Sequence, residues 1–128
     1  MTAAETLSEI RLPLLRLHKA VLATERRTIE RVHGQMSGAE FLQLVSDPVR
    51  YGWLKPFSEL ILAIDDSLEV DDDLDEQIAT PEEMLARIRE LLQPPKGDTP
   101  FGRRYLSLMQ REPELVIAHS AVLKLLPA

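Results

Sequence analysis

The 128-residue chain contains no cysteine, only five glycines and a single tryptophan. Without cysteine, disulfides, thiolate zinc sites, iron–sulfur clusters and cysteine nucleophiles are excluded. No apolar run approaches the roughly 20 residues that span a bilayer. The N-terminus carries acidic residues where a secretory signal has an apolar stretch. We therefore expect a cytoplasmic protein that does not bind a membrane.

The motifs of common catalytic sites are missing as well. The sequence has neither a G-x-S-x-G nucleophile elbow nor a glycine-rich phosphate-binding loop. The adjacent carboxylates of Asp65 and Asp66 are the nearest approach to an acid–base pair. Helical spacing places Asp65 at the border of an apolar face and Asp66 toward solvent. These observations favour a non-enzymatic protein without a cofactor.

Positive charge is absent from the middle of the chain. Residues 58–83 hold eleven Asp and Glu and no Lys or Arg, whereas the segments before and after carry +2 and +3, for a net charge of −6. Nucleic-acid binding needs a cationic face. A helix-turn-helix protein would use outward arginines such as Arg103, Arg104 and Arg111, but the net charge of this chain is negative. The acidic segment predicts a basic protein partner.

Apolar residues recur at helical spacing almost throughout, and no alternating run predicts a strand. Prolines and capping residues fall where helices should begin or end. The expected helices span about 4–33, 38–45, 48–54, 56–69, 81–93, 99–111 and 113–126. We therefore predict an all-α fold, a compact bundle of four longer helices plus two or three short ones. It forms a single domain over residues 1–128, with an acidic loop at about 69–79.

Pro13 interrupts the first helical stripe. It predicts either a kink in one long helix or the start of a second helix. An unbroken helix of 30 residues would be about 45 Å long, whereas a compact chain of this size has a diameter of roughly 36 Å. The overhang would carry Leu7 and Ile10 into water. We therefore predict a homodimer, in which the acidic segment of one copy faces the more basic ends of the other.

Aromatic residues are few, and most of them lie close together in the sequence. Four fall within seventeen residues, near two prolines: Phe41, Tyr51, Trp53 and Phe57. One interpretation is an aromatic core at a proline-shaped corner, which would bury Trp53 and Phe57. The other is a ligand pocket or partner groove walled by Trp53.

Two histidines, His18 and His119, lie on apolar helix faces, and Glu25 shares the stripe of His18. If they are packed in the core, each should hydrogen-bond a backbone carbonyl, Tyr105 or a carboxylate. The alternative is a metal site, because two histidines and a carboxylate that converge from different helices are a suitable ligand set.

Two further patterns resemble metal-binding motifs but are incomplete. Glu30 and His33 form one E-x-x-H copy, whereas di-iron bundles use two copies and further carboxylates. Positions 1, 3, 5 and 12 of an EF-hand frame are filled by Asp71, Asp73, Asp75 and Glu82. Glu76 stands where that frame needs glycine, so we interpret this segment as a solvated acidic connector.

Two functions remain open from the sequence. The first is a non-enzymatic helical bundle that acts through protein–protein contacts with its own copies or with a basic partner. The alternative is a bundle that binds a ligand or a metal through His18, Glu25 and His119 near Trp53. Such a bundle could also be an enzyme. Convergence of the two histidines in the fold distinguishes the two functions.

Overall fold

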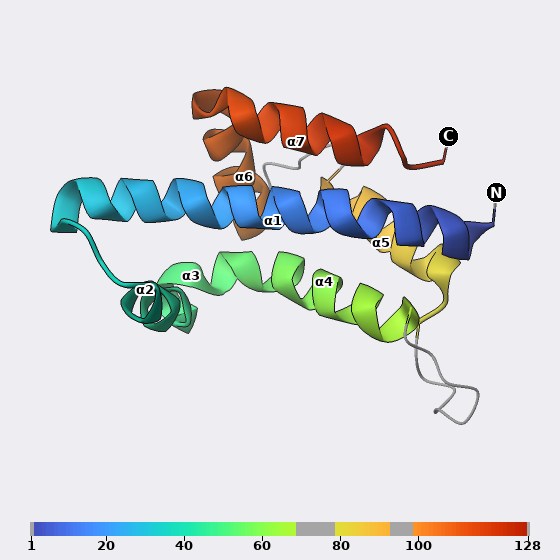
Figure 1. Cartoon of the computed structure of the whole chain (residues 1–128), viewed down its shortest axis with the longest axis horizontal. Coiled ribbons are helices and arrows are strands. Elements are labelled where there is room, and N and C mark those ends of the chain that lie inside the picture. Colours follow the sequence, from blue (N-terminus) through green and yellow to red (C-terminus); the bar gives the residue numbers. More distant parts are fainter. Residues whose placement is uncertain (1, 69–78, 93–98, 128) are drawn as a thin grey trace.

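The computed structural model of the chain describes residues 2–68, 79–92 and 99–127, and these residues form an all-α fold without strands (Figure 1). The elements are α1 (Ala3–His33), α2 (Gly38–Val45), α3 (Pro48–Tyr51), the 3-10 turn η1 (Gly52–Leu54), α4 (Lys55–Leu68), α5 (Pro81–Leu92), α6 (Pro100–Arg111) and α7 (Pro113–Leu123). The predicted fold class is confirmed. The proposed acidic loop, including Asp71, Asp73 and Asp75, lies outside the described residues apart from its last position.

Capping side chains define the starts of the helices. Ser37, Asp47, Thr80 and Thr99 each accept a hydrogen bond from a backbone N–H two or three residues ahead, at 2.9–3.2 Å. These residue types are preferred there because the first backbone N–H groups of a helix have no partner within it. Gly34 ends α1 with a φ of 81°, a left-handed conformation that glycine adopts without strain.

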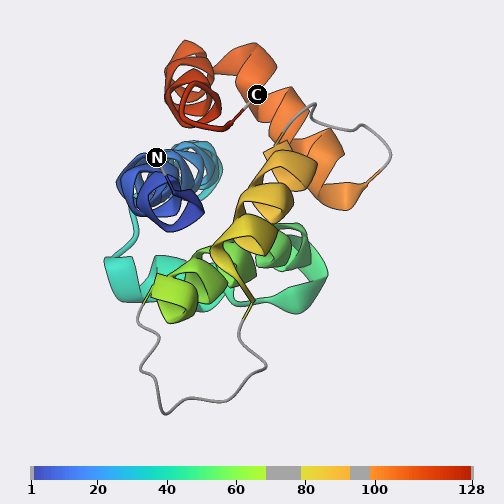
Figure 2. The same ribbon diagram turned by 90° about the vertical axis from the view of Figure 1, so that its right-hand side faces the viewer.

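Helix α1 continues through Pro13 as a single 31-residue helix. It is the long axis of the molecule, with α7 along one side and α4 and α5 along the other (Figures 1 and 2). A proline inside a helix costs about 3 kcal/mol. Burial of Leu7, Ile10 and Leu14 around it offsets that cost, at roughly 1.5–3 kcal/mol for each side chain.

The expected exposure of Leu7 and Ile10 was wrong, because both are fully buried within one chain. The expectation assumed a spherical bundle, whereas the neighbouring helices extend beside α1 along its length (Figure 1). At its first turns, Thr6 shares a surface hollow with Leu85 and Arg89 of α5. Because α1 leaves neither Leu7 nor Ile10 exposed, the expected overhang gives no support to the predicted homodimer.

An aromatic layer joins four helices inside the core. Phe57 of α4 packs edge-on against His18 of α1 at 5.1 Å and against Phe101 of α6 at 5.8 Å, between ring centroids. Phe101 stacks on Tyr105 at 5.0 Å, and Tyr105 contacts His119 of α7. The predicted burial of Phe57 is confirmed. None of the helices in the described ranges is both long and apolar enough to span a membrane.

Candidate functional site

Trp53 walls a surface groove and does not belong to the fully buried core. The groove lies between the α3–η1 corner and α6 and has a volume of about 800 Å³. Its apolar lining includes Pro48, Val49, Trp53, Pro56, Pro100 and Phe101. The expected burial of Trp53 is therefore met only in part. Its indole packs on the core with one side and remains partly exposed, because the η1 turn places it at the edge of the bundle.

The groove has a positively charged rim. Arg103 and Arg104 line it, and none of the described lining residues is acidic. The guanidinium of Arg104 lies over the Trp53 ring, with its central carbon 5.8 Å from the ring centroid. Because a cation is attracted to the face of an indole, this contact fixes the arginine at the groove wall.

The four sequence-predicted aromatic residues separate into two roles. Trp53 lines the groove, and Tyr51 lines a second pocket on the other side of Arg104. Phe41 and Phe57 are buried. Phe41 packs beneath the guanidinium of Arg26 at 5.6 Å. The corner is therefore partly core and partly accessible surface.

The second pocket has a volume of about 410 Å³ and contains Glu25, whose side chain is only 1% exposed. One nitrogen of Arg104, Nη2, lies 3.3 Å from each carboxylate oxygen and donates a hydrogen bond to Oε2. Oε1 has no hydrogen-bond partner among the described residues. Burial raises the pKa of Tyr51 above its usual value and the charge of Glu25 raises it further, so the phenol in this pocket is neutral.

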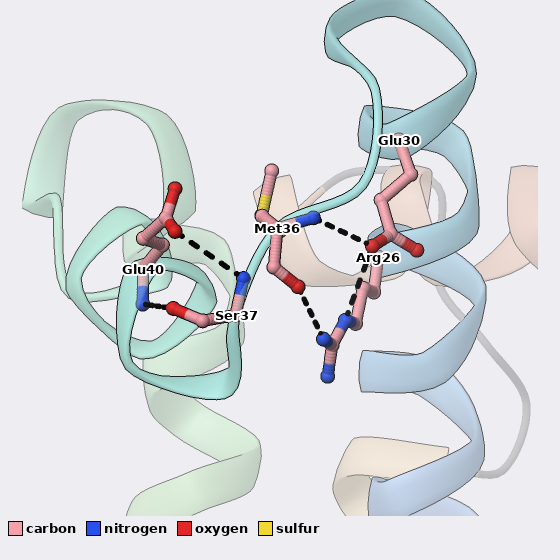
Figure 3. A network of polar contacts seen from close by, with 5 residues as sticks. All are labelled: Arg26, Glu30, Met36, Ser37 and Glu40. Carbon is pink, nitrogen blue, oxygen red and sulfur yellow. Dashed lines mark hydrogen bonds and ion pairs between the residues drawn. The ribbon is translucent and has the colours of Figure 1, made fainter.

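A polar network holds the corner between α1 and α2 that forms one wall of this pocket (Figure 3). The backbone of Met36 donates to Glu30 Oε2 at 3.0 Å and accepts from Arg26 Nη2 at 2.7 Å. Ser37 and Glu40 then form a capping box at the start of α2. Because both backbone groups of Met36 are bonded to side chains of α1, this wall of the pocket is held in place.

Both histidines have partners within the fold. The Nδ1 atom of His119 lies 2.7 Å from the Tyr105 hydroxyl, as expected for a packed histidine. The Nε2 atom of His18 lies 3.0 Å from the hydroxyl of Ser58, a partner that the sequence did not indicate. Burial raises the pKa of Tyr105 well above its usual range, so its hydroxyl keeps its proton and remains available to His119.

The metal site of the alternative interpretation is not formed. Across residues 2–68, 79–92 and 99–127, no three His, Asp or Glu side chains are placed to hold a metal ion. His18, Glu25 and His119 therefore do not converge, because each faces a different partner. Glu30, from the E-x-x-H pattern, bonds the backbone of Met36.

We expect acidification to destabilise the protein through its buried histidines. Burial lowers the pKa of His18 and His119 below the ordinary 6.5. As the pH falls, the histidines of the unfolded chain therefore bind protons before those of the folded protein. The free energy of unfolding should fall as the pH drops through 6.5, by at most about 1.4 kcal/mol per pH unit for each histidine. Urea unfolding between pH 7.5 and 5.5 measures the change. His18→Asn and His119→Asn should each reduce the slope. Stability that rises on acidification would contradict the assignment.

The carboxylate pair considered for acid–base chemistry has a structural explanation. Asp65 Oδ1 lies 2.6 Å from Arg11 Nε, an ion pair that links α4 to α1. Asp66 is exposed, as expected.

These features define a class: an all-α protein with an arginine-rimmed apolar groove beside a pocket that contains a buried carboxylate. Comparisons with protein-family models, with curated proteins and with solved structures find no match for this chain. Its function is therefore inferred from the geometry of the groove and the pocket.

Proposed function

We propose that the protein is a non-enzymatic interaction domain that binds a second copy of itself through the Trp53 groove. The observation that supports this is the groove itself, which is apolar, rich in proline and aromatic side chains, and rimmed by arginine. Tryptophan and arginine are the residues that most often dominate binding energy at protein interfaces. Val49, on the groove wall, is 91% exposed, so water covers an apolar side chain that a partner would shield.

The surface that we propose to face the groove is the outward acidic side of segment 58–83 of the second copy. That segment carries eleven acidic and no basic residues, and the described groove lining carries two arginines and no acid. In a two-fold dimer each copy offers its acidic segment to the groove of the other, so both contacts form together. The basic partner that the acidic segment predicts is then the arginine rim of an identical chain.

The mass of the protein in solution tests this proposal. Light scattering in about 0.15 M salt should give twice the 14.5 kDa of one chain. Val49→Asp should give the mass of one chain, because it places a charge in the apolar wall. Aspartate suits the first turn of a helix, so α3 should still form. The matched control is Ile117→Asp on α7, where the side chain is 71% exposed and away from the groove; this variant should remain a dimer.

The electrostatic part of the contact has its own test. Arg103→Glu should weaken the dimer, and raising the salt concentration should weaken the wild-type dimer by screening the charges. A wild-type mass of one chain at every accessible concentration would overturn the proposal. A dimer that persists unchanged in Val49→Asp would also overturn it, because the interface would then lie elsewhere.

A further inference from the structure

The pocket beside Glu25 contains a buried acceptor that the described part of the protein leaves unfilled. Glu25 Oε1 is buried and accepts no hydrogen bond, although Arg104 Nη2 lies 3.3 Å from it as an ion pair, and Oε2 accepts one hydrogen bond from the same nitrogen. A carboxylate has capacity for about four donors, and an unfilled acceptor in a buried ion costs free energy. A ligand that brings an N–H donor, above all a positively charged one, would fill this acceptor.

The same pocket also offers positive charge for an anionic group. Arg50 and Arg104 both line it, and Arg104 uses only Nη2 to contact Glu25. The guanidinium has five N–H donors, and the side chain of Arg104 is 44% exposed, so donors remain for a carboxylate. The Glu25 and Arg104 charges lie 3.3 Å apart. A ligand whose ammonium and carboxylate groups are attached to the same carbon matches this separation, with its ammonium group at Glu25 and its carboxylate at Arg104.

The remaining walls are apolar. They are formed by Ile29 and Val32 of α1, Met36 of the corner and Leu44 of α2. The network of Figure 3 fixes the backbone of Met36, which reduces the entropy lost when a ligand binds. The volume of about 410 Å³ is at the small end of the range for ligand pockets.

We infer that this pocket binds an α-amino acid with an apolar side chain. On binding, the Glu25 carboxylate turns toward the pocket so that the ammonium group of the ligand donates to Oε1. The carboxylate of the ligand contacts the guanidinium groups of Arg50 and Arg104, and its side chain lies against the apolar walls. Among the described residues, this pocket shares only Arg104 with the groove that is proposed for the dimer, and the inference goes beyond the proposed function.

The single tryptophan of the chain makes binding measurable. Because Arg104 lies over the Trp53 ring, a carboxylate at Arg104 changes the surroundings of the indole. Titration with L-leucine, L-methionine or L-phenylalanine should change Trp53 fluorescence saturably, and calorimetry should give one ligand per chain. N-acetyl-L-leucine lacks the ammonium and L-leucine methyl ester lacks the carboxylate. Each should bind at least about tenfold more weakly than L-leucine.

Variants connect binding to the pocket. Glu25→Gln keeps the shape of the side chain and removes its charge. This variant should weaken the binding of L-leucine at least about tenfold. Glu9→Gln, exposed on the same helix, is the matched control and should bind like the wild type. If Glu25→Gln does not fold by circular dichroism, Arg50→Ala takes its place, because Arg50 is exposed and its loss should weaken the carboxylate contact alone.

The outcomes distinguish this inference from the dimer. Glu25→Gln should leave the solution mass unchanged, and Val49→Asp should leave amino-acid binding unchanged. No binding of any of the three amino acids at millimolar concentration would overturn the inference. In that case a buried water, and not a ligand, would donate to Oε1. Equal binding of N-acetyl-L-leucine and L-leucine would overturn it as well, because Glu25 would then not recognise the ammonium group.

Discussion

Replacing Phe57 by alanine is expected to lower the free energy of unfolding by about 3–5 kcal/mol. The ring is completely buried and touches both His18 and Phe101 edge-on. Its removal loses the burial of an aromatic side chain and leaves a cavity between α1, α4 and α6. Urea unfolding followed by helical circular dichroism measures the loss.

Two variants control this measurement. Phe57→Leu keeps most of the volume and should cost less than half as much as Phe57→Ala. Leu62→Ala lies on the same helix, where the side chain is 64% exposed, and should change stability by no more than about 0.5 kcal/mol. A loss below about 1 kcal/mol for Phe57→Ala would show that the aromatic layer does not hold these helices together.

Replacing Arg104 by alanine is expected to cost about 3 kcal/mol, because it leaves Glu25 as an unpaired buried charge. This is at the low end for a buried pair, since Arg104 itself is 44% exposed while Glu25 is 1% exposed. The change also removes the cation from the Trp53 ring. Chemical unfolding and Trp53 fluorescence report the two effects separately.

The charge explanation predicts a rescue. Glu25→Gln combined with Arg104→Ala should recover part of the loss, since the double variant contains no buried charge. The neighbouring Arg103 is exposed on the same helix, and Arg103→Ala should change stability by no more than about 0.5 kcal/mol. If the double variant were no more stable than Arg104→Ala alone, packing of the arginine stem would explain the loss.

Local features of the fold were predictable from the sequence. The caps at Ser37, Asp47 and Thr80 were indicated by residue type and spacing, because a capping hydrogen bond joins residues two or three apart. The buried position of Phe57 followed from helical periodicity, which depends only on neighbours along one helix. The dimer and the acidic connector remain predictions.

The binding features were predictable only in part. The cluster of aromatic residues and prolines around Trp53 predicts either a core residue or a groove residue, and nothing in it indicates the partner Arg104. The sequence indicates Glu25 as an inward carboxylate, and only the alternative interpretation makes it a metal ligand with His18 and His119. The structure instead pairs it with Arg104, 79 residues away, and no spacing within one helix indicates a partner on another.

The sequence by itself determined the helices, their ends and the side chains that face inward, because each of these depends on residues within one or two turns. Only the tertiary structure decided what those side chains meet. It buried Leu7 and Ile10 within a chain in which α7, α4 and α5 pack beside α1, and it placed Arg104 between Trp53 and Glu25. Such contacts depend on how separate helices pack against one another, and helical periodicity along the chain carries no information about that arrangement.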